Sequence, residues 1–179
     1  MSTSCLSKTE IALHWLIAIV MIGMLILGKY IDANQAYHLM PLHKSIGIAI
    51  FAFILWRCVL RLQKGFPSAL GNPPFIQHLL AKVVHIVLLL GTFLFPLSGM
   101  IMSAMGGRGL SLFGIELFAM NIVDGKPTPI NPELAGLASN IHGALLPIMI
   151  VAIVLHIIGA IYHHRVVKDD TLNRMLGRV

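Results

Sequence analysis

The chain has 179 residues, of which 57% are apolar and only 11% are Asp, Glu, Lys or Arg. In a soluble domain roughly a quarter of the residues are charged, and the much lower fraction in this chain could not cover the surface of such a domain. The composition excludes intrinsic disorder and, with the mean hydropathy of +0.86, argues against a soluble fold, so it predicts a membrane protein. Nine histidines outnumber the seven acidic residues, which is unusual in so apolar a chain.

Four segments are apolar enough to cross a bilayer as helices, which takes about 20 residues each. They cover about residues 10–28, 39–62, 78–105 and 140–163. The second segment reaches this length only if Lys44, Arg57 and Arg61 extend to the membrane interfaces. The segments lack the alternation of polar and apolar residues that membrane β-barrels show. We therefore predict an all-α fold, an integral membrane four-helix bundle forming a single domain over residues 1–179.

The distribution of basic residues predicts the orientation of the chain in the membrane. Four spans place both termini on one side, which receives nine Lys and Arg residues, while the other side receives four. The nine are Lys8, Arg57, Arg61, Lys64, Lys82, Arg165, Lys168, Arg174 and Arg178, and the four are Lys29, Lys44, Arg108 and Lys126. Basic residues concentrate in cytoplasmic loops, so both termini are expected in the cytoplasm. The bases are scattered along the membrane edges, which argues for contact with lipid and against nucleic acid.

Residues Leu110–Val123, between the third and fourth spans, are apolar apart from Glu116 and are too short to cross the membrane. They predict a cap or an interfacial helix on the outer side.

Four histidines fall into two pairs of equal depth. His142 and His156 are 14 residues apart in the fourth segment, about 40° short of four helical turns and roughly 21 Å along the axis. His43 of the second segment matches the depth of His142, and His14 of the first matches that of His156. Two such pairs predict two stacked b-type haems, each with an iron held by two imidazoles. An iron ligated in this way has no free position, which favours electron transfer over oxygen binding.

Other interpretations of the histidines remain open. An intramembrane histidine can simply hydrogen-bond a neighbouring helix, whereas one zinc site is disfavoured because the pairs lie too far apart. His85 lies at the inner depth and competes with His14 for the inner iron. His78, Lys82 and His85 share one face of the third segment, where they could serve a quinone headgroup or a haem propionate. Alternatively, His78 and Lys82 only extend to the interface.

Taken together, several short motifs resemble the bacterial cytochrome b561 family of diheme membrane cytochromes. The motifs are His14-Trp15, Leu42 to Gly47, Arg57 with Arg61, His85, Ile141-His142-Gly143, Leu155-His156, His163-His164 and the tail Lys168 to Leu176. Related proteins are the cytochrome b subunits of membrane hydrogenases and formate dehydrogenases. The resemblance implies four helices, two non-covalent haems b and electron exchange with the quinone pool. It also implies that His14 and His156 ligate the cytoplasmic haem iron and that His43 and His142 ligate the outer one.

The leading hypothesis is a diheme cytochrome that transfers electrons across the inner membrane, either as an electron carrier or as a quinone-linked oxidoreductase. Ubiquinone or menaquinone is the expected partner, and superoxide or another small reductant is a candidate donor. The alternative is a haem-containing anchor subunit of a periplasmic dehydrogenase or hydrogenase. A periplasmic redox protein and a second copy of the chain are further candidate partners. A small transporter or channel is a remote alternative, because the chain lacks inverted repeats and acidic residues within the cores of the spans.

Overall fold

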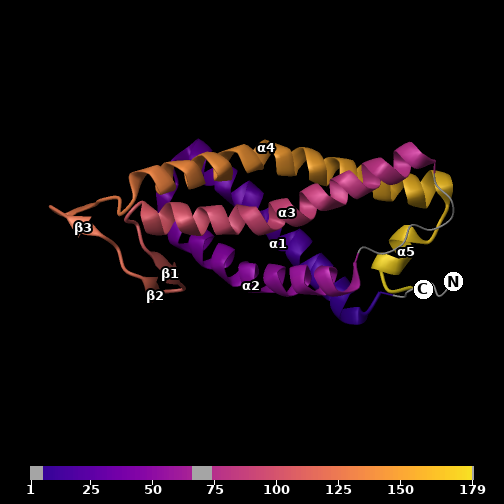
Figure 1. Ribbon diagram of the computed structural model, residues 1–179, viewed down its shortest axis with the longest axis horizontal. Coiled ribbons are helices and arrows are strands. Elements are labelled where there is room, and N and C mark those ends of the chain that lie inside the picture. The colour runs from indigo at the N-terminus through magenta and orange to yellow at the C-terminus, as the bar shows by residue number, and fades with distance from the viewer. Residues whose placement is uncertain (1–5, 66–73, 179) are drawn as a thin grey trace.

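The computed structural model describes residues 6–65 and 74–178, and its four long helices form one bundle (Figure 1). The long helices are α1 (Lys8–Asn34), α2 (Met40–Lys64), α3 (Phe75–Met105) and α4 (Pro132–Tyr162). Three short elements complete the helical part: η1 (Tyr37–Leu39) before α2, and η2 (His163–Val167) and α5 (Thr171–Met175) after α4. Each long helix has the length and composition to cross a membrane, which confirms the predicted four-helix fold.

The first and fourth helices begin at well-capped residues. Ser7 and Glu10 form a capping box at the start of α1, in which each side chain accepts a hydrogen bond from the backbone of the other residue. At the start of α4 the Asn131 side chain accepts from the Leu134 amide, 3.0 Å away, and Pro132 occupies the first turn. This cap starts α4 at Pro132 rather than near residue 140, so His142 lies well inside the helix.

Helices that follow one another in the chain pack against one another, and α3 and α4 run side by side along the bundle (Figure 1). Within the described residues, the backbone of α4 makes little close contact with α1 or α2. The pair α1 and α4 carries the predicted pair His14/His156, and the pair α2 and α4 carries His43/His142.

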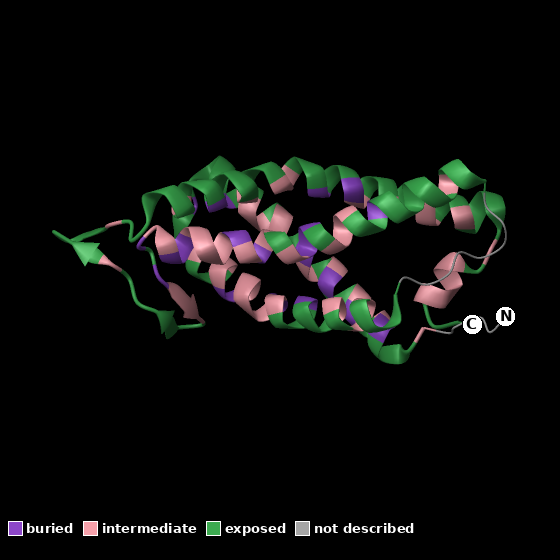
Figure 2. Ribbon diagram, viewed as in Figure 1, coloured by how far each residue is buried: buried purple, intermediate pink, exposed green. Residues whose placement is uncertain are grey.

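A small apolar core lies between the two histidine levels. Ile17 and Met21 of α1 and Ile50 and Ile54 of α2 form one buried cluster, with Phe93 and Phe95 of α3 packed against it. Elsewhere the helices expose large apolar side chains, including Ile19, Ile26, Val151 and Ile158. Figure 2 shows that much of the surface of the bundle is exposed. In water this surface would be strongly unfavourable, so lipid is the solvent that the fold requires.

The segment between α3 and α4 forms two β-hairpins at one end of the bundle, so of the two predictions for Leu110–Val123 the cap fits and the interfacial helix is wrong. Strand β1 (Leu110–Leu112) pairs antiparallel with β2 (Ile115–Phe118), and β3 (Ile122–Val123) pairs with β4 (Lys126–Pro127). Both tight turns have two residues with positive φ, namely Phe113-Gly114 and Asp124-Gly125. Such turns are typical of two-residue hairpins and incompatible with a continuous helix.

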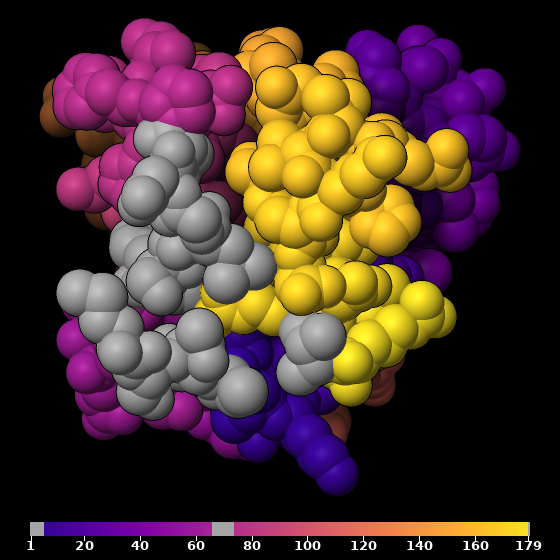
Figure 3. All heavy atoms as spheres, turned by 90° about the vertical axis from the view of Figure 1, so that its right-hand side faces the viewer, coloured from indigo at the N-terminus to yellow at the C-terminus, as the bar shows by residue number. Residues whose placement is uncertain are grey.

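The two ends of the bundle have different covers. The hairpins lie at one end, called here the hairpin end, where Lys44 Nζ donates to the carbonyl oxygens of Arg108 and Gly109 at 3.2 and 3.4 Å. The start of α1 and α5 lie at the other, the α5 end (Figure 1). Figure 3 views the α5 end and shows the C-terminal segment spread over the middle of this face. There the Trp15 indole donates to the Met175 carbonyl at 2.8 Å, which holds α5 against α1.

Candidate functional site

Two of the predicted histidines face each other near the hairpin end. The ring centres of His43 on α2 and His142 on α4 are 6.5 Å apart. Both rings line a cavity of about 430 Å³ that all four long helices enclose. Gly47 and Gly143 also line it, and a Cβ added at Gly143 would meet no atom within 4 Å. The volume falls within the range of cofactor sites, and the lining is mainly apolar.

The His142 ring is oriented by two groups of α3. Its Nδ1 lies 2.9 Å from the Phe95 carbonyl oxygen and 3.2 Å from Ser98 Oγ. Ser98 Oγ itself donates to the Phe95 carbonyl, so Nδ1 of His142 is the donor to both oxygens. The proton of the neutral ring is then on Nδ1, and Nε2 carries the lone pair that a metal requires.

The partner ring, His43, has an unsatisfied nitrogen. Its Nδ1 is buried and has no hydrogen-bond partner among residues 6–65 and 74–178. A buried polar atom without a protein partner is costly and is found where a group other than a side chain completes the site. Gly28 leaves room for this ring, because a Cβ there would lie 3.3 Å from His43 Cε1.

Three histidines gather nearer the α5 end. The ring centre of His156 on α4 is 6.1 Å from that of His14 on α1 and 5.2 Å from that of His85 on α3. His14 also contacts Arg57 of α2, whose Nη2 lies 3.2 Å from His14 Nδ1. Sequence reasoning placed the three histidines at one depth but missed this contact with Arg57.

The distances between ring centres distinguish the possible pairs. A bond from a metal to an imidazole nitrogen is about 2 Å long and the ring centre lies about 1 Å further, so two rings on opposite sides of one metal would have centres about 6 Å apart. The pairs His14/His156 and His43/His142, at 6.1 and 6.5 Å, are close to this value. The rings of His85 and His156, at 5.2 Å, are closer together than rings on opposite sides of one metal would be.

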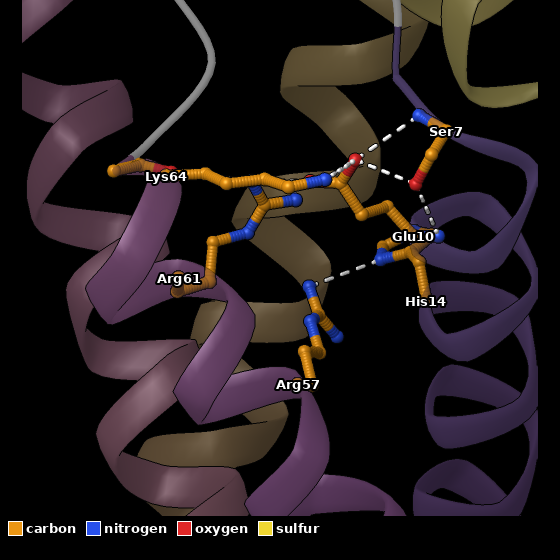
Figure 4. Close-up of polar contacts among 7 residues, drawn as sticks. Ser7, Glu10, His14, Arg57, Arg61 and Lys64 are labelled. Atoms are coloured by element: carbon orange, nitrogen blue, oxygen red, sulfur yellow. Dashed lines mark hydrogen bonds and ion pairs between the residues drawn. The ribbon is translucent and has the colours of Figure 1, made fainter.

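A charged cluster lies one helical turn from His14 toward the α5 end (Figure 4). The Glu10 carboxylate, only 7% exposed, accepts from Arg61 Nη1 at 3.5 Å and from Lys64 Nζ at 3.2 Å. It also accepts from the amide and hydroxyl of Ser7, at 3.0 and 2.8 Å. The cluster connects the start of α1 to the end of α2 beside the three histidines nearer the α5 end.

The cavity at the hairpin end has a positively charged border. Lys29, Lys44 and Arg108 line it together with one acid, Asp32. Asp32 is paired with Lys29 at 3.3 Å, so the charges of Lys44 and Arg108 have no acid beside them in the cavity lining. The border therefore favours an anion.

The remaining histidines lie away from these pairs. His78 and Lys82, predicted to share a face with His85, are exposed on α3, as are His38 and His164 elsewhere. His163 is half-buried, and its Nδ1 lies 2.6 Å from Asp169 Oδ2. Burial raises the pKa of Asp169, but hydrogen bonds from Thr171 and His163 outweigh burial and hold this pKa below its ordinary value.

Comparison with known proteins gives the class of the site. Residues 6–178 match the family model described as prokaryotic cytochrome b561. The chain belongs to the prokaryotic cytochrome b561 family. It is 32% identical to cytochrome b561 homolog 1 of Escherichia coli K12 over 96% of this chain and 97% of the relative. It is 34% identical to cytochrome b561 homolog 2 of the same organism, over 93% and 88%. It is 27% identical to the "Probable superoxide oxidase CybB" of Yersinia pestis, over 98% and 96%.

As a member of the cytochrome b561 family, the protein is a multi-pass bacterial membrane cytochrome b, and its class of activity is electron transfer. Family membership implies haem b. The described residues fit such a group, because His43 has an orphaned buried nitrogen and His142 presents a free Nε2 lone pair. The space beside Gly143 adds room for a macrocycle.

Proposed function

We propose that this cytochrome b561 protein holds two haems b and passes electrons across the inner membrane between a small reductant outside and the quinone pool. The observation that carries the proposal is the presence of two histidine pairs with ring centres 6.1 and 6.5 Å apart. Both pairs use a histidine of α4, and about 21 Å of helix separates His142 from His156. His14 and His156 would hold the inner haem, and His43 and His142 the outer one.

Bound haem b supplies an iron that accepts and returns one electron at a time. The protein residues fix where this happens. Phe95 and Ser98 hold His142 with its proton on Nδ1, while Ile17 and Ile54 keep the layer between the pairs apolar. If both histidines of a pair bound the iron, they would leave no position for oxygen, which would restrict the haem to electron transfer.

For the reductant we propose superoxide. The relative from Yersinia pestis is named as a probable superoxide oxidase, and the border of the outer cavity carries the excess positive charge of Lys44 and Arg108. Two superoxide anions would each lose one electron and leave as oxygen. The two electrons and two protons would convert one quinone to quinol, which balances atoms and charge.

We place quinone exchange, with ubiquinone or menaquinone as the acceptor, on the α5 side, where the proposed orientation puts the cytoplasm. His85 is the member of the predicted quinone stripe that contacts the inner histidines, at 5.2 Å from His156 between ring centres. The exposed His78 and Lys82 lie further along the same helix toward its start.

Haem content and redox titration of the purified protein test the ligand assignment. A pyridine haemochrome assay should give two haems b per chain. His43→Ala or His142→Ala should remove the outer haem alone, His14→Ala or His156→Ala the inner haem alone, and His85→Ala neither. One haem in the wild type, or loss of a haem with His85→Ala, would contradict the assignment.

Stopped-flow reduction by superoxide tests the donor. The wild type should be reduced at a rate that falls as ionic strength rises, because screening weakens attraction to Lys44 and Arg108. Arg108→Gln should lower the rate severalfold and flatten its salt dependence, whereas Lys126→Gln on β4, outside the cavity lining, serves as the matched control. A rate that is independent of salt and of Arg108 would exclude this role for the border.

A further inference from the structure

The contact between Arg57 and His14 fixes the proton of the imidazole. A guanidinium has only N–H groups, so it can donate but not accept. Nδ1 of His14, 3.2 Å from Arg57 Nη2, must therefore be the acceptor, and the proton of the neutral ring is on Nε2. This is the opposite of His142, whose Nδ1 donates to Phe95 and leaves Nε2 free.

A histidine that binds iron through Nε2 needs its lone pair there and its proton on Nδ1. In that form His14 cannot accept a hydrogen bond from Arg57. Ligation through Nδ1 would have the same consequence, because Arg57 occupies that nitrogen. Either way, the half-buried guanidinium of Arg57 must find another acceptor when His14 binds iron.

Among the residues described, no carboxylate contacts Arg57. Glu10, the acid of the cluster, already accepts from Ser7, Arg61 and Lys64. Arg57, Arg61 and Lys64 together carry three positive charges against the single charge of Glu10. Figure 4 shows Arg61 and Lys64 directed toward Glu10, and Arg57 directed toward His14 instead. The inner site thus has an unneutralised guanidinium beside a proposed haem ligand.

We propose that Arg57 binds a propionate of the inner haem. A propionate is a carboxylate carried by the haem itself, and a guanidinium matches its two oxygens with a charge-assisted, two-pronged hydrogen bond. The proposal rests on the proposed function, since it requires a haem at His14 and His156. It moves the predicted propionate site from the stripe of His78, Lys82 and His85 to α2.

The test is haem dissociation from the full-length protein, using two forms of the cofactor. The wild type and Arg57→Gln are reconstituted with haem b and with its dimethyl ester, which lacks the carboxylates, and transfer to an excess of apomyoglobin is followed. With haem b, Arg57→Gln should speed loss of the inner haem about tenfold or more. The two proteins should lose the dimethyl ester at equal rates, because the ester has no carboxylate for Arg57 to bind.

Lys64→Gln is the matched control. It removes one positive charge from the same end of α2, but Lys64 contacts Glu10 and is 51% exposed. We expect this variant to keep the wild-type dissociation rate. Redox titration gives a second measurement: Arg57→Gln should move the potential of the inner haem to more negative values and leave the outer haem unchanged, since a positive charge favours the reduced iron.

Each outcome decides the inference separately from the proposed function. A wild type without an inner haem refutes the proposed function itself. A wild type with two haems in which Arg57→Gln has no effect, or speeds loss of both cofactor forms equally, overturns the role of Arg57. The outer haem reports whether the variant is folded. If Arg57→Gln does not assemble, Arg57→Lys replaces it, because lysine keeps the positive charge but cannot form the paired hydrogen bonds of a guanidinium. This variant must lose haem b faster than the wild type does, and the dimethyl ester at the wild-type rate.

Discussion

Gly99 of α3 limits the space around the proposed outer ligand. A Cβ at this position would lie 3.1 Å from His142 Cε1 and 3.3 Å from Nδ1, and the ring cannot retreat without breaking its bonds to Phe95 and Ser98. We expect Gly99→Ala to weaken binding of the outer haem about tenfold, because an extra methyl group in a tightly packed site costs about 1–3 kcal/mol. Haem titration of the purified chain measures this loss, and the inner haem should stay in place.

Gly136→Ala is the control for this substitution, because a Cβ at Gly136 on α4 meets no atom within 4 Å. It should bind both haems as the wild type does. If the two alanine variants bind the haems equally well, the His142 ring can move away from a Cβ at position 99, and its contacts with Phe95 and Ser98 do not fix it.

Asp169 should make the α5 end sensitive to acid. Its pKa is lowered in the folded protein, so its contribution to stability is present above the ordinary carboxyl pKa of about 3.9 and is lost as the pH falls through the lower, folded value. At pH 7 we expect Asp169→Asn to open residues 163–178 about tenfold more often. The difference between the variant and the wild type should begin to shrink near pH 4 and should vanish only below the lower pKa of the folded protein.

Amide hydrogen exchange over the same residues measures this opening. Asp170→Asn serves as the control, since Asp170 is exposed and its carboxylate accepts only from the Asn173 side chain, at 2.9 Å, in the structure described. If the difference between Asp169→Asn and the wild type stays constant with pH, the carboxylate does not hold α5 in place.

At the scale of elements, one buried serine joins the hairpins to the bundle. Ser45 Oγ on α2, in a side chain 3% exposed, donates to the Pro41 carbonyl at 2.8 Å and accepts from the Phe113 amide at 2.9 Å. Ser45→Ala should cost about 1 kcal/mol of local stability. Exchange of the Phe113 amide should then be severalfold faster, while the helices keep their protection.

Ser111→Ala is the comparison for this variant. It removes a hydroxyl from β1 but retains the backbone carbonyl of Ser111, which lies 3.3 Å from Ser45 Oγ. Faster exchange in both variants would assign the effect to the hairpin sequence rather than to the bond between the hairpin and α2.

At the scale of the molecule, the hairpin end should face the periplasm and the α5 end the cytoplasm. We expect a cysteine replacing Lys126, in a chain with Cys5 and Cys58 changed to Ser, to react with an impermeant maleimide in intact cells. A cysteine replacing Lys168 should react only after the inner membrane is opened. The reverse pattern would invert the direction of the proposed electron transfer.

The helix bundle was predictable because each long helix is specified by the residues of its own segment. Uncharged runs of membrane length predict helices wherever they lie in a chain, and the four long helices confirm them. The depths of His14, His43, His142 and His156 follow from counting residues along a regular helix, and the structure places these residues in two facing pairs. Their role as iron ligands stays a prediction.

The hairpins were missed although their signal is present. Asp124-Gly125 is a typical two-residue hairpin turn, but the apolar residues around it were interpreted as an interfacial helix. Phe113 has positive φ, which few side chains tolerate, so the first turn carries a weaker signal in its sequence.

The sequence by itself therefore determined that the protein lies in a membrane, that it has four long helices and at what depth each histidine lies. These properties follow from the apolar composition of each segment and from the constant rise per residue of a helix. Only the tertiary structure decided which groups complete each site. Arg57 beside His14, Ser98 beside His142 and His85 at 5.2 Å from His156 each come from a different helix than their partner. Rotation and packing of helices, which no single helix specifies, set those contacts.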